Sequence, residues 1–406
     1  MKYDINHEQL IYPATIIRGG TSRGLYFHAD EIPTLEEGQA EFLSAAEGKP
    51  DPLEIDGLGG AQIVTSKIAI VRPSKRAGAD VDYTFVQVEP ESDSVDYNAN
   101  CGNISSGVPL FALDRGMITL PDGEQTIRIW NTNTSKMFYA QLMVKNSRAV
   151  MMGDYKIAGI PGSGAKIFLD FRDTSGAESG KLFPTGRVKD AITMEDGSKI
   201  DVTICDVANM LVYINSAAVG YKGTEPISEL NANKQLFERC AEIRGKSAKL
   251  AGLVERWQDG KQLLLPPVCM VSPAQDYLSS SGVVIKSNEC ALIGKIVCPF
   301  DILPTFMGTG SCCFAAAANV PGTVVYEMLN NKIAASFVFG HPGGSMEVEV
   351  EAILNDDCNK IIFKRLGFGR TARKIADCSV YIKPETLKTL KTKIKVILPK
   401  NRCNLY

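Results

Sequence analysis

The segment Asn98-Ala99-Asn100-Cys101-Gly102-Asn103 leads directly into an apolar stretch, Ile104 to Leu113. The apolar residues of that stretch recur at helical spacing, which predicts a buried helix that begins at a polar, glycine-containing turn. A similar turn, Met307-Gly308-Thr309-Gly310, precedes a second apolar segment, Ser311 to Asn319. Two buried helices with similar entry turns suggest an internal duplication of the chain.

Short β-like runs lie between these helical segments. Ser66 to Arg72, Tyr83 to Val88 and Met346 to Ile353 are examples, with β-branched or alternating apolar residues. Helical patterns are fewer, and include Glu36 to Glu47 and Lys234 to Ala251. Strand-rich segments around single buried helices predict an α+β fold.

Bulk composition limits the class of protein. A length of 406 residues predicts two or three domains. The net charge of −2 provides no basic field for nucleic acid or anionic lipid, so we expect neither as a partner. The N-terminus lacks a signal-peptide pattern and no apolar stretch is long enough to span a bilayer, so we expect a cytoplasmic protein without membrane contact.

Cysteine and histidine usage bears on cofactors. The chain has 11 cysteines without a C-x-x-C pair, which is typical of reduced thiols. Its 3 histidines stand far apart and lack metal-ligand spacing. The glycine motifs that bind nucleotides are also missing. We therefore expect no metal and no other cofactor.

The first candidate binding segment is the glycine-rich run Arg18 to Gly24. Its members combine two guanidinium groups, two hydroxyls and backbone N–H groups exposed by glycine, a composition that suits a carboxylate. The candidate substrate-binding residues are Arg18, Gly19, Gly20, Thr21, Ser22 and Arg23. The alternative is a turn between two strands with solvated arginines.

The second candidate segment is Thr65-Ser66-Lys67, which precedes the apolar run Ile68 to Val71. Lys67 either extends its amine to the surface or lies partly desolvated with a lowered pKa, ready for proton transfer. The sequence leaves both interpretations open.

The third candidate segment is the turn around Cys101. A thiolate is stabilised at the start of a helix, so Cys101 suits a base or nucleophile, with Asn100, Gly102 and Asn103 beside it for anion binding. The alternative is a buried capping turn in which the cysteine only fills space.

Two further segments could complete a second wall of the anion site. Met307, Gly308, Thr309 and Gly310 form one, and His341 lies in the other, Gly340 to Gly344. Each segment is also explained by ordinary turn chemistry. The basic run Arg370 to Lys374 is most simply a solvated strand edge, from which one arginine could reach inward.

These motifs occur together with several others in one order along the chain. They are RGGTSRG (18–24), TSK (65–67), NANCGN (98–103), PGSGA (161–165), PTG (184–186), PGT (321–323), GHPGG (340–344) and RTAR (370–373). As a set they resemble the PrpF-like family of 2-methylaconitate cis-trans isomerases and aconitate isomerases, which also holds methylitaconate Δ-isomerases and 4-oxalomesaconate tautomerases. Arg23 departs from the lysine usual in the family, so substrate choice is expected to differ.

The resemblance implies a diaminopimelate-epimerase-like fold. In that fold two pseudo-symmetric lobes each wrap a mixed sheet around a central helix, with the active site in the cleft between them. The lobes are expected at residues 1–184, joined by a C-terminal strand at 390–398, and at residues 185–389. The family's proton-transfer pair carries over to Lys67 and Cys101, and its carboxylate-binding loop to residues 18–24.

Racemases of this fold use two thiols, one at each helix start. Met307 stands where the second thiol would be, and a thioether cannot exchange a proton, so an amino-acid epimerase is disfavoured. The resemblance thus implies a cofactor-independent isomerase of a small unsaturated tricarboxylate, with aconitate preferred. Alternatives are 2-methylaconitate, methylitaconate or oxalomesaconate as substrate, and a carboxylate-binding protein without catalysis. Which of Lys67 and Cys101 is the base stays open, as does a homo-oligomeric state.

Overall fold

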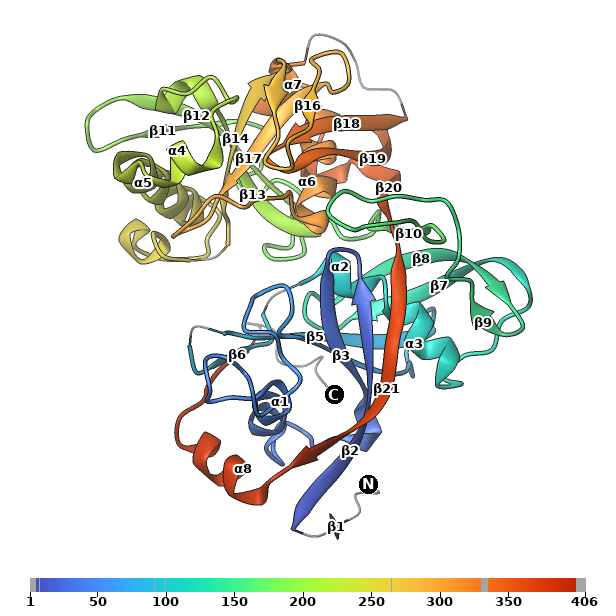
Figure 1. Cartoon of the computed structure of the whole chain (residues 1–406). Coiled ribbons are helices and arrows are strands. Elements are labelled where there is room, and N and C mark those ends of the chain that lie inside the picture. Colours follow the sequence, from blue (N-terminus) through green and yellow to red (C-terminus); the bar gives the residue numbers. More distant parts are fainter. Residues whose placement is uncertain are drawn as a thin grey trace. The chain divides into compact units, whose positions relative to one another are not determined.

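The computed structural model describes residues 5–6, 8–90, 92–98, 100–263, 265–329 and 335–398. The chain forms two compact units (Figure 1). The first unit comprises residues 1–169 and 369–406, and the second comprises residues 170–368. Both division points precede those expected from the sequence, which were 184 and 389. The segment 390–398 belongs to the first unit, where its strand Lys395–Ile397 pairs with Ser94–Asp96.

The first unit is mostly sheet. Its strands are β1 (Ile5–Asn6), β2 (Gln9–Gly19), β3 (Ser22–His28), β4 (Lys67–Pro73), β5 (Val81–Val88), β6 (Ser94–Asp96), β7 (Gly123–Asn131), β8 (Lys136–Lys145), β9 (Arg148–Ala149), β21 (Ala372–Ile382) and β22 (Lys395–Ile397). Its helices are α1 (Gln39–Glu47), α2 (Gly102–Ser105), α3 (Val108–Asp114), α8 (Pro384–Lys391) and the 3-10 turn η1 (Ala29–Glu31). β10 (Ile167–Asp170) and β20 (Ile362–Arg370) cross the two division points.

The second unit has a similar balance of elements. Its strands are β11 (Asp190–Thr193), β12 (Lys199–Val207), β13 (Asn209–Asn215), β14 (Val268–Pro273), β15 (Tyr277–Leu278), β16 (Val284–Ile285), β17 (Leu292–Val297), β18 (Ser336–His341) and β19 (Gly344–Ile353). Its helices are α4 (Ile227–Asn231), α5 (Lys234–Leu250), α6 (Gly308–Ala318) and α7 (Val324–Glu327), with 3-10 turns η2 (Ser216–Val219), η3 (Trp257–Gly260) and η4 (Cys358–Lys360).

The two units repeat one sheet topology. In the first unit the strand order is β21-β2-β3-β4-β5-β7-β8. The pairs β3–β4 and β5–β7 are parallel, and the other four pairs are antiparallel. In the second, β11-β12-β13-β14-β17-β18-β19 has the same pairings in the same order. The helices α2 and α3 lie between β5 and β7 in the chain, as α6 lies between β17 and β18. The predicted α+β fold and the internal duplication are confirmed.

Each sheet packs helices on both faces. In the first unit, α1 and α8 lie together over one face, where Phe27, Phe42 and Ile70 belong to one apolar cluster (Figure 1). The opposite face packs against α2 and α3, with Tyr26 5.8 Å from Phe111 between ring centroids. Burial of these apolar faces is the main stabilising term for a sheet of this kind.

The predicted helices form, with some differences in their bounds. The segment Ile104 to Leu113 is divided into α2 and α3, because Pro109 lacks an N–H and occupies the first turn of α3. Helix α6 begins at Gly308, earlier than the expected Ser311, and every one of its residues is buried. The strands β14 and β17 were not predicted, because their short apolar runs carry little periodicity, and the longer strands β20 and β21 were missed as well.

The core of the second unit centres on Phe314 of α6. Its ring centroid lies 5.5 Å from those of Tyr213 and Phe306, 5.1 Å from that of Phe337 and 4.9 Å from that of Phe339. Since Phe314 is fully buried, it contributes both apolar burial and aromatic packing.

We expect Phe314→Ala to lower the free energy of unfolding of the second unit by about 3–5 kcal/mol, because the cavity cannot collapse around a stacked cluster. Urea unfolding monitored by circular dichroism measures the change. The control is Phe300→Ala, whose ring is 80% exposed and whose loss is expected to matter little. Equal effects of the two variants would contradict this account of the core.

Candidate active site

Asn103 of α2 binds the turn between β2 and β3 through its side-chain amide. Its amide nitrogen donates to Thr21 Oγ1 at 2.9 Å and to Ser22 Oγ at 3.3 Å. Its carbonyl oxygen accepts from Arg370 Nε at 3.0 Å. The structure therefore brings the predicted residues Thr21, Ser22 and Asn103 together, and adds Arg370 to them.

Glycines allow this close approach of helix and turn. A Cβ atom on Gly19 would lie 2.3 Å from the carbonyl oxygen of Asn103. Gly20 has a φ of +51°, and a Cβ there would lie 2.2 Å from Asn103 Oδ1. A side chain at Gly19 would therefore displace the backbone of α2, and one at Gly20 would displace the side chain of Asn103 and strain the positive φ of the turn. The Gly20 N–H donates to Thr371 O at 2.9 Å, so in this structure that donor holds the turn.

Both arginines of the glycine-rich run donate to backbone carbonyls. Arg18 Nη1 donates to Gly20 O at 2.8 Å and to Thr371 O at 3.0 Å. Burial and the nearby Arg373 lower the pKa of Arg18. Arg23 Nη2 donates to Leu58 O at 3.3 Å and Gly59 O at 3.2 Å, which ties it to the loop before Lys67. The two guanidinium groups thus order the loops around the turn.

Lys67 is the first residue of β4 and is buried, with 7% of its surface exposed. Its Nζ donates to Gln87 Oε1 at 2.5 Å and lies 5.0 Å from the centre of the Phe85 ring. Of the two interpretations left open, the structure shows the buried one. Thr65 is half-buried and donates to Gln62 O at 3.2 Å.

Two buried carboxyl groups lie behind Lys67. Glu54 Oε2 accepts from Ser66 Oγ at 2.6 Å and from the N–H of Ala61 at 2.7 Å. Glu47 is fully buried, and neither of its carboxyl oxygens has a hydrogen-bond partner in the described part of the chain. Burial, followed by the charge of Glu54, raises the pKa of Glu47, and Arg23 and Lys67 oppose that rise.

Cys101 is half-buried and immediately precedes α2. Its carbonyl oxygen accepts from the Ser105 N–H at 3.0 Å and from Ser105 Oγ at 2.9 Å. Tyr26 and Tyr83 lie close to it, and burial, then the charge of Cys101, raises the pKa of both phenols. Because Tyr83 and Phe85 share a face of β5, Cys101 and the Lys67 amine lie over the same face of the sheet.

Asparagines fix the segment that leads into Cys101. Asn100 Oδ1 accepts from Asn131 Nδ2 at 2.9 Å. Asn133 Nδ2 donates to Tyr97 O at 2.6 Å and to Phe85 O at 2.8 Å. Gly102 is the first residue of α2 and is buried. The turn that carries Cys101 is therefore held from β5 and from the end of β7.

The remaining predicted residues lie in the second unit. Met307 caps the N-terminus of α6, with its sulfur 3.9 Å from Asn209 Nδ2, and the residues Gly308, Thr309 and Gly310 form the first turn of that helix. His341 is buried, and its Nδ1 accepts from the Gly343 N–H at 3.2 Å. Cys312 and Cys313 lie inside α6, beyond its first turn, so the helix start of the second unit carries no thiol.

Comparison with known proteins identifies the family. The protein-family model described as PrpF protein matches residues 9–383. The chain belongs to the PrpF family. The 3-methylitaconate isomerase of Eubacterium barkeri is 36% identical over 94% of this chain and 99% of that protein. The 2-methyl-aconitate isomerase of Shewanella oneidensis is 30% identical over 85% and 90%, respectively.

Solved structures agree with this assignment. A crystal structure of a methylitaconate-delta-isomerase superposes with a TM-score of 0.82 at 35% identity, over 94% of this chain and 97% of that chain. A hydroxyproline epimerase from Agrobacterium vitis, 14% identical with a TM-score of 0.51 over 93% and 94%, shares the fold alone. This PrpF-family protein is an isomerase with an epimerase-type α+β fold, and the resemblance found in its sequence is confirmed.

Sequence reasoning missed several residues around the site of this PrpF-family chain. Gln87 lies near the end of β5, a buried strand that also contains Asp82 and Thr84, so its polar side chain did not stand out in the sequence. The sequence allowed one arginine of the basic run to reach inward but did not indicate its partner; Arg370 reaches Asn103, whereas Arg373 is exposed. Asn131 and Asn133 form hydrogen bonds with residues more than 30 positions earlier in the chain, and no local sequence pattern indicates such partners.

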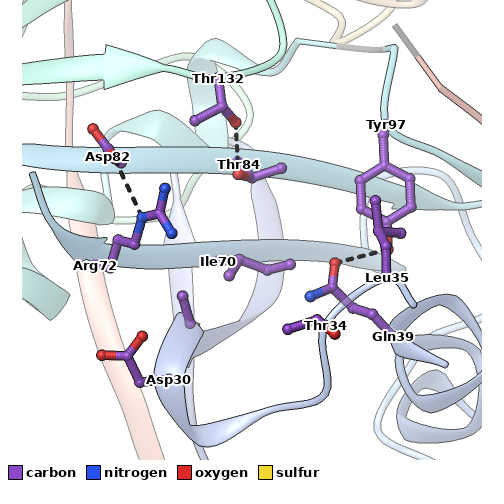
Figure 2. Close-up of a pocket in the computed structure, with 11 residues that line it drawn as sticks. Asp30, Thr34, Leu35, Gln39, Ile70, Arg72, Asp82, Thr84, Tyr97 and Thr132 are labelled. Carbon is purple, nitrogen blue, oxygen red and sulfur yellow. Dashed lines mark hydrogen bonds and ion pairs between the residues drawn. The ribbon is translucent and has the colours of Figure 1, made fainter. Parts of the chain in front are cut away.

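A small cavity of about 100 Å³ lies on the sheet face opposite Lys67 (Figure 2). Its polar side chains bond mainly to one another. Thr84 Oγ1 lies 2.6 Å from Thr132 Oγ1, Tyr97 donates to Gln39 at 3.1 Å, and Arg72 pairs with Asp82 at 3.2 Å. Since Ile70 and Arg72 point away from the face that bears Lys67, the cavity is separate from the candidate site.

The described residues lack the features of a metal centre and of a membrane span. That part of the chain contains no group of three or more His, Cys, Asp or Glu side chains arranged to hold a metal ion. Among the described helices, none combines the length and the apolar character needed to cross a bilayer.

We expect the buried Glu47 to make folding pH-dependent. Because its pKa is raised above the usual 4.5, the folded protein holds a proton that the unfolded chain has released, so this group's contribution to the free energy of unfolding falls as pH rises above 4.5. Urea unfolding of wild type and Glu47→Gln at several pH values measures it: the variant should gain stability relative to wild type as pH rises. Glu41→Gln on the same helix is the control, and a pH-independent difference for Glu47→Gln would contradict the assignment.

Proposed function

We propose that this protein isomerises a small unsaturated polycarboxylate without a cofactor, with Lys67 and Cys101 as its proton-transfer pair. The observation that carries the proposal is the buried Lys67 amine on the same sheet face as the helix start at Cys101. Amines and thiols exchange protons near neutral pH once their surroundings adjust their pKa values. The names of the relatives, a methylitaconate and a methylaconitate isomerase, support the substrate class.

The proposed reaction moves one proton and one double bond. Either Lys67 or Cys101 takes an allylic proton next to, or conjugated with, a substrate carboxylate, and the electron pair of the broken C–H bond enters a dienolate. The dienolate charge spreads into that carboxylate, where fixed donors stabilise it. Reprotonation at the far carbon gives the double-bond isomer, and reprotonation at the original carbon after rotation gives the cis-trans isomer.

The group around Asn103 supplies donors for a substrate carboxylate in this proposal. Thr21 and Ser22 present hydroxyls, and Arg18 and Arg370 present guanidinium groups, all gathered by one turn and one helix start. A guanidinium group suits a carboxylate because it offers parallel N–H donors. A site with several such donors would bind a substrate with two or three carboxylates more tightly than a monocarboxylic acid.

Aconitate is the first substrate to test, as the sequence resemblance suggested. A second candidate is 3-methylitaconate, because the 3-methylitaconate isomerase of Eubacterium barkeri is 36% identical and spans nearly the same length. The two candidates predict different chemistry. Aconitate would undergo cis-trans or allylic isomerisation, whereas 3-methylitaconate would undergo a shift of its double bond.

Proton NMR in D₂O tests the function directly. We expect the chelator-treated protein to incorporate deuterium into cis-aconitate or 3-methylitaconate and to form the corresponding isomer. Lys67→Ala and Cys101→Ser should each lower kcat by about 10²–10⁴-fold, the range typical of a lost acid or base.

The matched controls are Lys145→Ala, an exposed lysine, and Cys378→Ser, a half-buried thiol on β21. Near-wild-type turnover in either active-site variant would refute the assigned role of that residue. Binding without deuterium exchange for aconitate, 2-methylaconitate, 3-methylitaconate and oxalomesaconate would instead identify a non-catalytic carboxylate-binding protein.

A further inference from the structure

The partner of Lys67 is a neutral amide. Gln87, on β5, is paired directly with Lys67 in the antiparallel ladder, and its Oε1 accepts from Lys67 Nζ at 2.5 Å. Both side chains are buried, with 7% of Lys67 and 4% of Gln87 exposed. Water therefore competes little for this hydrogen bond, and its geometry is set by the protein.

The orientation of the Gln87 amide is fixed by its own partners. Its Nε2 donates to Ser66 O at 2.8 Å, to Val88 O at 3.1 Å and, at 3.4 Å, to Ile63 O. Carbonyl oxygens only accept hydrogen bonds, so the amide nitrogen must face them and the amide oxygen must face Lys67. Backbone carbonyls from the segment before Lys67 and from β5 thus determine where its acceptor lies.

The charged groups near Lys67 form hydrogen bonds with other partners, except for Glu47, whose raised pKa favours its neutral form. Within the described residues Lys67 forms no ion pair, and its other contact is with the face of Phe85. Glu54 accepts from Ser66 and Ala61, and the raised pKa of Glu47 favours its protonated form. Arg23, which also acts on Glu47, donates to the loop carbonyls of residues 58 and 59. Cys101 faces the same side of the sheet.

The second unit shows that the sheet itself does not require a polar pair at this position. In the first unit, Lys67 at the start of β4 pairs with Gln87 near the end of β5. The corresponding strands of the second unit are β14 and β17, and there Val268 at the start of β14 pairs with Val297 at the end of β17. Two valines complete the same topology, so the lysine–glutamine pair is a feature of the first unit and not of the fold.

We propose that Gln87 is a positioning residue for the reaction, a neutral acceptor that aims Lys67 Nζ and leaves its proton free to be given up and regained. The proposal rests on the proton-transfer role of Lys67 given above. A carboxylate in place of the amide would hold the lysine as an ammonium ion, and an apolar side chain would leave the amine without direction. Only a neutral acceptor permits both protonation states in one geometry.

The substitution Gln87→Glu tests this directly, through the pH dependence of kcat/KM. A carboxylate within hydrogen-bonding distance of Lys67 favours the ammonium form, so the limb of the profile that reports Lys67 should move to higher pH by about 1 unit or more. If Lys67 is the base, this is the ascending limb, and activity at lower pH should fall about tenfold for each pH unit that the limb moves. Gln141→Glu, which adds the same charge to β8, should leave the profile unchanged.

A second variant, Gln87→Met, keeps the volume of the side chain and removes the acceptor. We expect kcat to fall at least about tenfold while KM changes little, because substrate binding does not involve Gln87. Thermal unfolding of both variants separates this loss from a loss of folded protein. NMR of ¹³Cε-labelled lysine, assigned with Lys67→Arg, should show the Lys67 titration displaced upward in Gln87→Glu.

The outcomes separate this inference from the proposed function. If Lys67→Ala is inactive but Gln87→Glu titrates as wild type does, the role of Gln87 is refuted and the proton-transfer role of Lys67 stands. Wild-type kcat in Gln87→Met refutes the role of Gln87 as well. If Lys67→Ala retains activity, both the proposed function of Lys67 and the role of Gln87 are refuted.

Discussion

The contact between the first turn of α2 and the β2–β3 turn is the constraint on which the rest of the candidate site depends. It is possible because Gly19 and Gly20 leave no Cβ atoms between the two segments. Asn103 then occupies the interface, and the hydroxyls of the turn and the guanidinium group of Arg370 are arranged by its single amide. The helix that carries Cys101 is held against the sheet by the same contact.

Most elements of the fold could be predicted from the sequence because they are recorded in local patterns. The buried helices after Cys101 and Met307 were found from apolar spacing, and Pro109 explained the division of the first one. The position of Lys67 at a strand start was also local information. Its burial was not, because burial depends on which strand pairs with β4 and what covers the face.

The parts of the candidate site that were not predicted are those made by long-range pairing. Gln87 meets Lys67 because β4 and β5 run antiparallel in one register, and Arg370 meets Asn103 across most of the chain length. A glutamine within a buried strand, or an arginine in a basic run, gives no sign of its partner until the sheet is formed. Functional assignment from motifs therefore recovered the loops and Asn103 but missed partners such as Gln87, Asn131 and Asn133.

The discontinuity of the first unit has a consequence for the order in which the protein matures. Strand β2 pairs with β21 over all but its first residue, from Leu10 opposite Ile382 to Gly19 opposite Ala372. On the ribosome β21 emerges only after the second unit, residues 170–368, has been synthesised. The second unit is continuous in sequence, so all of its strands are synthesised before β21, whereas β2 lacks this partner until then. The half of the molecule that bears Lys67 and Cys101 is thus the last to be completed.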